Sequence, residues 1–134
     1  MLSKTHILSL MSDLTLNQRF GSNATYNNTN KTLTINLNDL TDAGDIADGL
    51  GLDITGITAA NANDYASKIF YALLLLNFQQ QPDTNNDETV AMYITNGGRR
   101  DITRNGVSQF AYLLTVNNYT PNNLATVLDP DLMA

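Results

Sequence analysis

The feature that most constrains the fold is a long apolar segment at residues 61–81. Its apolar side chains recur at the spacing of an α-helix and form one continuous stripe, made by Ala66, Ile69, Leu73 and Leu76. Asn61 is a good N-cap residue, Asp64 complements the positive end of the helix dipole, and Pro82 prevents the helix from continuing. Because the middle of the segment is apolar nearly all round, the sequence predicts a long buried helix that forms the core.

The rest of the chain carries patterns that are typical of β-strands. Apolar and polar residues alternate around an Asn-rich stretch, which predicts a β-hairpin at 24–37, because Asn tolerates the positive φ of a tight turn. Two further turn signals are Asn96-Gly97-Gly98 and Asn105-Gly106. They separate three more predicted strands, which lie near 89–95, 102–104 and 108–118. The predicted fold class is therefore α+β, with one small antiparallel sheet of these strands packed on the helix near 61–81.

The length of 134 residues predicts a single domain over 1–134. Residues 1–22 form an N-terminal segment without an assigned structure, because residues 5–16 fit both a short helix and a strand. The segment shows no clear signal-peptide pattern. An Asp- and Gly-rich loop is predicted over 39–56, with one helical turn around 42–50, and a short helix is predicted over 121–128. Residues 129–134 are left as a C-terminal tail. No apolar run approaches the roughly 20 residues of a membrane span, so no membrane partner is expected.

Charge and composition exclude several classes of site. The net charge is −6 and the chain holds only seven Lys and Arg residues, which argues against nucleic acid as a partner. It has no Cys and one His, so disulfides, thiolate metal sites and sites with two imidazoles are excluded. The 18 Asn and 16 Thr residues show that the polar surface is largely uncharged.

No motif completes a catalytic or metal site. Asp83, Asn85 and Asp87 reproduce the opening of an EF-hand calcium loop. That motif next requires Gly and then a bidentate carboxylate at its twelfth position, where this chain has Glu88 and Ile94. No nucleophile elbow and no phosphate-binding loop followed by lysine occurs either. We therefore expect no catalytic residue, no metal site and no cofactor, and the sequence argues against an enzyme.

A short basic stretch departs from the acidic character of the chain. Arg99, Arg100 and Arg104 are three of the seven cations and lie between the two turn signals. We expect them to project from a hairpin tip as a subunit contact with an acidic partner. A protein partner is favoured over a phosphate backbone, and a solvent-exposed turn without a partner is the alternative.

The tail supplies a second candidate contact. Leu132 and Met133 form an apolar pair after the helix-breaking Asp129-Pro130. So short a tail gains too few internal contacts to order itself in water. Its apolar pair must therefore rest on the chain's own sheet or on a neighbouring subunit, and the second arrangement, a subunit-contact arm, is favoured.

Three classes of function remain open. The first is a structural subunit of a larger assembly, such as a virion head, neck or tail component or an extracellular lattice, with copies of itself and other subunits as partners. It is favoured because uncharged polar side chains lose less entropy than long charged ones when they are ordered in subunit contacts. The second is a carbohydrate-binding or adhesion module, in which Asn, Asp and Tyr would bind the sugar. The third is a small enzyme.

Overall fold

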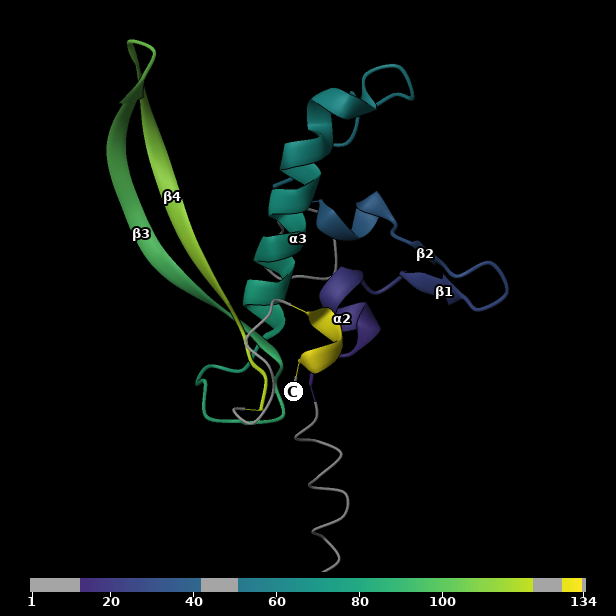
Figure 1. Ribbon diagram of the computed structural model, residues 1–134. Coiled ribbons are helices and arrows are strands. Elements are labelled where there is room, and N and C mark those ends of the chain that lie inside the picture. Colours follow the sequence, from purple (N-terminus) through teal and green to yellow (C-terminus); the bar gives the residue numbers. More distant parts are fainter. Residues whose placement is uncertain (1–12, 42–50, 122–128, 134) are drawn as a thin grey trace, which may run out of the picture. The chain divides into compact units, whose positions relative to one another are not determined.

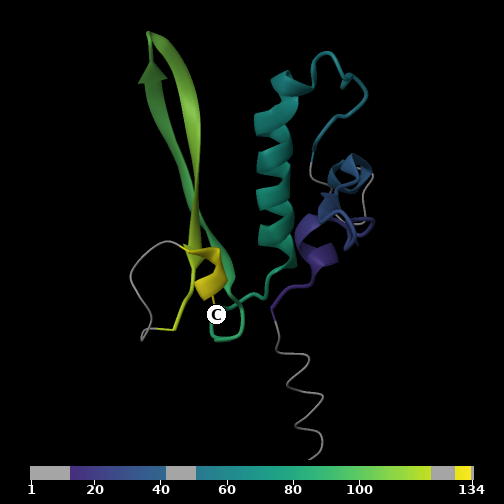
Figure 2. The same cartoon turned by 45° about the vertical axis from the view of Figure 1, so that its right-hand side comes forward.

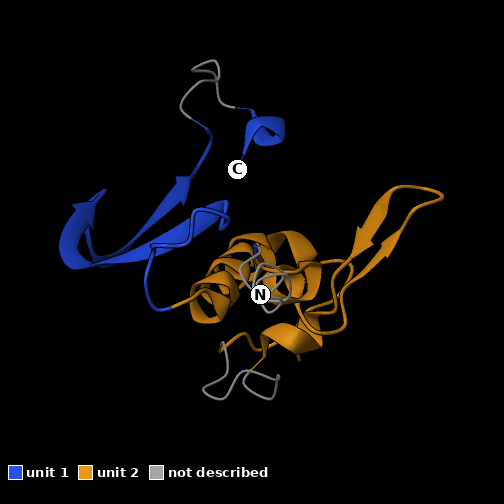
Figure 3. Cartoon of the chain, turned by 90° about the horizontal axis from the view of Figure 1, so that it is seen from below, with its two compact units in different colours: residues 1–13, 83–134 blue, residues 14–82 orange. Residues whose placement is uncertain are grey.

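A computed structural model of the protein describes residues 13–41, 51–121 and 129–133 (Figure 1). The chain divides into two compact units (Figure 3). The helical unit is Leu14–Pro82, and the hairpin unit is Met1–Asp13 together with Asp83–Ala134. Helices and antiparallel strands are both present, which confirms the α+β class. The single-domain organisation over 1–134 stays a prediction.

The central element of the helical unit is α3 (Ala66–Gln80), which follows a 3-10 turn, η2 (Ala62–Tyr65). These two elements confirm the helix that was predicted near 61–81. The buried residues of α3 lie on one side only and are Ala72, Leu76 and Asn77, while Phe70 and Tyr71 are exposed. The helix is therefore covered on one side and is less buried than its composition led us to expect.

Asn61 does not cap the helix as expected. Its side chain makes no capping hydrogen bond. Instead, its Oδ1 accepts a hydrogen bond from the backbone N–H of Thr58 at 2.7 Å, and its Nδ2 donates to the carbonyl oxygen of Gly56 at 2.9 Å. Asn61 thus stabilises the loop before the helix, which is a common role for Asn in turns.

The core of the helical unit forms where α3 meets segments that precede it in the sequence. The buried cluster consists of Leu40, Leu52, Ala72 and Leu76. Half-buried apolar side chains pack around it, namely Ile35, Leu37, Ile54, Ile69, Leu73 and Leu75. Leu40 is the last residue of a second 3-10 turn, η1 (Leu37–Leu40). A short helix, α2 (Leu16–Phe20), lies beside α3 (Figure 2). The stripe of α3 therefore packs against other helical turns and loops of this unit.

A short hairpin of β1 (Thr25–Asn27) and β2 (Thr32–Thr34) also belongs to the helical unit. The Asn-rich turn was correctly predicted, because Asn27 Oδ1 accepts hydrogen bonds from two backbone N–H groups of the turn at 2.9 and 3.3 Å. Lys31 closes this turn with a φ of +57°. The paired strands are shorter than the expected 24–37, and all six of their residues are exposed.

The hairpin unit is built on a long antiparallel pair, β3 (Met92–Arg104) and β4 (Val107–Asn118). Asn105 and Gly106 connect the strands with φ values of +50° and +77°, as a type I′ turn requires. The second turn expected at Asn96-Gly97-Gly98 is wrong, because β3 runs through it as one strand. The strands predicted near 89–95 and 102–104 are thus parts of a single strand that starts at Met92.

The Asn-Gly-Gly sequence forms a β-bulge and not a turn. The pairing register shifts between Asn96 and Gly98, which leaves Gly97 as the extra residue on β3. Asn96 Oδ1 accepts a hydrogen bond from the backbone N–H of Gly98 at 2.8 Å, and Gly98 has a φ of +86°. A side chain at Gly97 would be crowded by Leu113 on the opposite strand, so glycine suits this position.

The strands form two separate two-stranded sheets, not the single sheet expected from the sequence. The physical reason is that each hairpin is closed by its own turn, whereas the alternation of apolar residues does not specify which strands pair. The turn and helix expected near 42–50 and 121–128, and most of the N-terminal segment 1–22, lie outside the described residues. None of the described helices combines the length and apolar content needed to span a membrane.

Candidate functional site

The β3–β4 hairpin has two faces, which its register defines. Side chains alternate along a strand, and residues that pair directly share a face. One face, here called the aromatic face, carries Ile94, Arg99, Asp101, Phe110, Tyr112, Leu114 and Val116. The opposite face, here called the basic face, carries Arg100, Ile102, Arg104, Val107, Ala111 and Leu113.

This register separates the three arginines that the sequence grouped together. Arg99 pairs with Tyr112 and lies on the aromatic face, whereas Arg100 and Arg104 lie on the basic face. Only Arg104 adjoins the Asn-Gly turn, so the expectation that all three project from a hairpin tip is wrong. The reason is that the expected turn before Arg99 is a bulge inside the strand. Their role as subunit contacts stays a prediction.

The aromatic face exposes large apolar side chains. Phe110 is 57% exposed and Tyr112 is 63% exposed, and Val116 on the same face is also exposed. Nearer the ends of the strands that lie away from the turn, Ile94 is fully buried. The two most exposed apolar side chains of this face, Phe110 and Tyr112, therefore lie nearer the turn, whereas Val116 pairs with the buried Ile94 toward the other end.

Arg99 and Asp101 place one charge of each sign on the aromatic face. The guanidinium carbon of Arg99 lies 4.1 Å from the centre of the Phe110 ring, a cation–π contact between diagonal neighbours. Asp101 pairs directly with Phe110 and is exposed. On the basic face, Arg104 Nε donates a hydrogen bond to Gln109 Oε1 at 2.6 Å.

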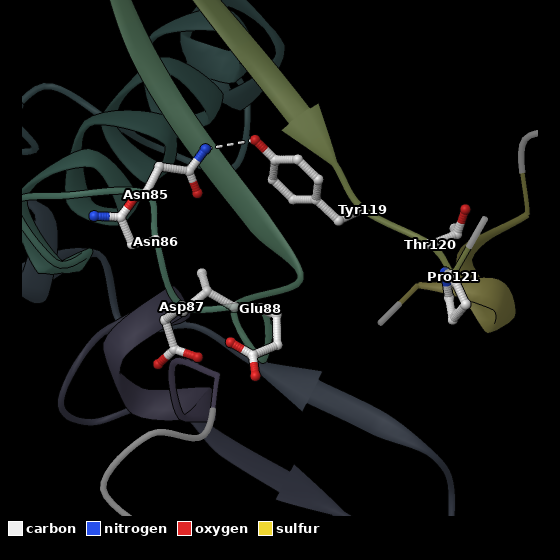
Figure 4. A pocket seen from close by; sticks show the side chains of 8 residues that line it. Asn85, Asn86, Asp87, Glu88, Tyr119, Thr120 and Pro121 are labelled. Carbon is white, nitrogen blue, oxygen red and sulfur yellow. Dashed lines mark hydrogen bonds between the residues drawn. The ribbon is translucent and has the colours of Figure 1, made fainter.

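A pocket of about 510 Å³ lies in the hairpin unit, next to the ends of the strands away from the turn (Figure 4). Asn85 Nδ2 donates a hydrogen bond to the Tyr119 hydroxyl at 2.6 Å (Figure 4). Asp87 Oδ1 accepts hydrogen bonds from the hydroxyl and the backbone N–H of Thr89, at 2.6 and 2.9 Å. The full lining is Asn85, Asn86, Asp87, Glu88, Val90, Tyr119, Thr120 and Pro121. Amides, carboxylates and one aromatic ring are groups that can bind a hydroxyl-rich ligand.

A smaller hollow of about 310 Å³ lies in the helical unit beside Asp53, Lys68 and Tyr71. Hydrogen bonds from the hydroxyl and the backbone N–H of Thr55 hold the pKa of Asp53 below its ordinary value, and the charge of Lys68 acts in the same direction. Asp53 therefore stays ionised, which makes it unsuited to donate a proton near neutral pH.

Two buried polar side chains were missed by the sequence reasoning. Asp39 is 6% exposed and accepts hydrogen bonds from the backbone N–H of Asn23 at 2.8 Å and from its Nδ2 at 2.7 Å. Asn77 is also 6% exposed and joins α3 to α2 through Arg19. No local signal distinguishes these two residues from the other Asp and Asn residues of the chain. Both side chains have their hydrogen bonds within the helical unit, so their role is structural.

The tail residues Leu132 and Met133 are half-buried. Leu132 ends a 3-10 turn, η3 (Pro130–Leu132), in which the side chain of Asp129 accepts a hydrogen bond from the backbone N–H of Asp131 at 3.0 Å. A subunit contact by this apolar pair stays a prediction.

Among the described residues, no three Asp, Glu or His side chains come together as a metal site would require. The chain matches no protein-family profile, no curated protein and no solved structure.

Proposed function

We propose that the protein is a non-catalytic structural subunit of a larger protein assembly, and that the aromatic face of the β3–β4 hairpin contacts another chain. The observation that supports this proposal is the exposure of Phe110 and Tyr112 on one face of a two-stranded sheet. Exposed aromatic side chains that cluster on one face are typical of protein contact sites, whereas apolar residues scattered singly are not.

The length of the hairpin supports the same proposal. A two-stranded hairpin is at best marginally stable in water, and three strands or packing on a further surface are normally needed. With 13 residues in β3 and 12 in β4, this pair spans about 40 Å at 3.3 Å per residue. A partner that covers the aromatic face would supply the missing packing.

The setting that we propose is a virion, in which the chain would serve as a head, neck or tail component beside copies of itself and other subunits. Its support is compositional. The 18 Asn and 16 Thr residues give an uncharged polar surface, and ordering such side chains in a contact costs less entropy than ordering Lys or Glu.

Substitution of the exposed aromatic residues tests the proposal. We expect Phe110→Ser and Tyr112→Ser to change the melting temperature of the dilute chain by less than about 5 °C, because neither side chain packs in a core. Both variants should sediment as smaller species than the wild type at high concentration. Tyr26→Ser is the matched control, since Tyr26 is 52% exposed on the β1–β2 hairpin of the other unit.

Two results would contradict the proposal. A fall of more than about 10 °C in the melting temperature of the dilute Phe110 or Tyr112 variant, but not of the Tyr26 variant, would show that the chain itself covers the aromatic face. If the wild type associates, equal sedimentation of the wild type and both variants at every concentration would show that association does not use this face.

A second candidate function is carbohydrate binding at the pocket of the hairpin unit. It is favoured by the amides of Asn85 and Asn86, the carboxylates of Asp87 and Glu88, and the ring of Tyr119 around one cavity. Binding of a glycan that is lost in Tyr119→Ala and retained in Tyr112→Ala would support this function over the first one.

A further inference from the structure

We propose that the partner on the aromatic face is a second copy of this chain, related by a two-fold axis so that Arg99 of each copy pairs with Asp101 of the other. This inference rests on the proposed function and names the partner. The charges on the two faces of the hairpin, the spacing of the paired residues and the area available support it.

The two faces differ in charge. The aromatic face carries Arg99 and Asp101 and is neutral, so it holds both members of a possible ion pair. The basic face carries Arg100 and Arg104 without an acidic residue on either strand. Two copies of the basic face would repel each other, whereas two copies of the aromatic face are complementary. A self-complementary patch is what a two-fold contact requires.

The spacing of the charged residues suits a two-fold axis that runs across the strands, parallel to the face. Arg99 and Asp101 lie two residues apart on β3, about 7 Å at 3.3 Å per residue. An axis midway between them stacks β3 on β3 in opposite directions, which places each Arg99 over the other copy's Asp101. On β4 the same axis places each Phe110 over the other copy's Tyr112, because these residues pair with Asp101 and Arg99.

The contact between Arg99 and Phe110 restricts the Arg99 side chain before a second copy binds. A guanidinium group stacked on a ring, here at 4.1 Å, loses side-chain freedom before the partner arrives. Its N–H donors lie in the plane of the group, and stacking leaves them able to bind a carboxylate in the bidentate manner. Sheets that pack face to face lie about 10 Å apart, a separation that these side chains span.

The area available predicts a weak contact. About ten residue levels of two strands give a face of roughly 33 Å by 10 Å, or about 700 Å² for both copies together. This value lies below the 1,200–2,000 Å² or so of stable complexes. We therefore expect a dimer that dissociates on dilution, and that other contacts would reinforce within an assembly.

Charge reversal provides the test. Sedimentation of the full chain is measured from micromolar to millimolar concentration for the wild type, Arg99→Asp and Asp101→Arg. We expect each variant alone to associate at least about tenfold more weakly, because like charges then meet across the axis. An equimolar mixture of the two variants should associate again, since both of its ion pairs are restored, and so should the double variant. Arg100→Asp on the basic face is the matched control and should associate as the wild type does.

Cross-linking provides a second readout that does not depend on charge. The chain has no cysteine, so introduced thiols have no competitors. With a bifunctional thiol reagent that spans about 10 Å, the separation of packed sheets, an equimolar mixture of Phe110→Cys and Tyr112→Cys should form mixed cross-links faster than either variant cross-links with itself, because the axis brings residue 110 over residue 112.

The outcomes separate this inference from the proposed function. A wild type that stays monomeric at every concentration, or an Arg99 variant that associates like the Arg100 variant, overturns the second copy as occupant of the face. Failure of the mixture to associate overturns the two-fold pairing. The proposed function fails instead on its own results, a large loss of stability in the dilute Phe110 or Tyr112 variant, or a wild type that associates and sediments as those variants do.

Discussion

Replacement of Asn77 by alanine isolates the contact that joins α2 to α3. Asn77 Oδ1 accepts a hydrogen bond from Arg19 Nη1 at 2.9 Å, and Asn77 Nδ2 donates to the Arg19 carbonyl oxygen at 2.9 Å. The same amide donates to the Leu73 carbonyl oxygen at 2.8 Å. Because Asn77 is 6% exposed, water cannot readily replace these partners.

The loss of stability that we expect for Asn77→Ala follows from these hydrogen bonds. The hydrogen bond from the charged Arg19 is worth about 2 kcal/mol, and the bond to the Arg19 carbonyl about 1 kcal/mol. Alanine is a better helix former than asparagine by about 0.5 kcal/mol, which offsets part of the loss. We therefore expect Asn77→Ala to lower the free energy of unfolding by about 2–3 kcal/mol, or the melting temperature by about 8–12 °C.

Urea unfolding followed by circular dichroism measures this change. The matched control is Gln79→Ala, an exposed position two residues further along the same helix. The control should gain slightly in stability through helix propensity alone. If the free energy of unfolding of Asn77→Ala lies within about 0.5 kcal/mol of that of the control, the hydrogen bonds to Arg19 do not stabilise the fold. The structural role that we assign to Asn77 would then be wrong.

Three further predictions concern the same fold. Gly21→Ala should lower the free energy of unfolding more than Gly98→Ala does. Both glycines have a positive φ, but only a Cβ at Gly21 would come within 2.6 Å of a buried carboxylate oxygen. Equal losses of the two variants in urea unfolding would refute this clash. Leu76→Ala should lower the free energy of unfolding by about 2–5 kcal/mol and Phe70→Ala by less than about 1 kcal/mol, since only the Leu76 side chain is buried. A larger loss for Phe70→Ala than for Leu76→Ala would mean that α3 buries its other side. Deletion of residues 129–134, which removes the half-buried Leu132 and Met133, should leave the melting transition nearly intact and reduce the oligomer seen by sedimentation. A loss of several kcal/mol in the truncated monomer would place the tail in the core.

Local patterns predicted the elements whose formation depends on local forces. The 3.6-residue spacing of Ile69, Leu73 and Leu76 identified α3, and Asn105-Gly106 identified the turn between β3 and β4. These signals work because a helical stripe and a type I′ turn are each determined by residues close together in the sequence.

The buried polar contacts could not be predicted, because their partners are distant. Asn77 binds a residue 58 positions away, and Asp39 binds one 16 positions away. The chain has 18 Asn residues, and nothing in the neighbours of Asn77 marks it as the buried one. Burial of Asn77 depends on how α2 meets α3, which is a property of the packed unit.

The bulge at Asn96-Gly97-Gly98 determines which charged side chains lie on the aromatic face. Regular alternation along β3 from Ile94 would place Arg100 on the same face as Phe110 and Tyr112. The extra residue, Gly97, shifts the alternation by one, so that Arg99 and Asp101 join the aromatic residues instead. Without the shift, the aromatic face would carry Arg100 and no acidic residue, and two copies would repel each other. The same glycine pair that resembles a turn in the sequence therefore gives the hairpin one neutral face and one basic face, and the two-fold pairing that we propose depends on it.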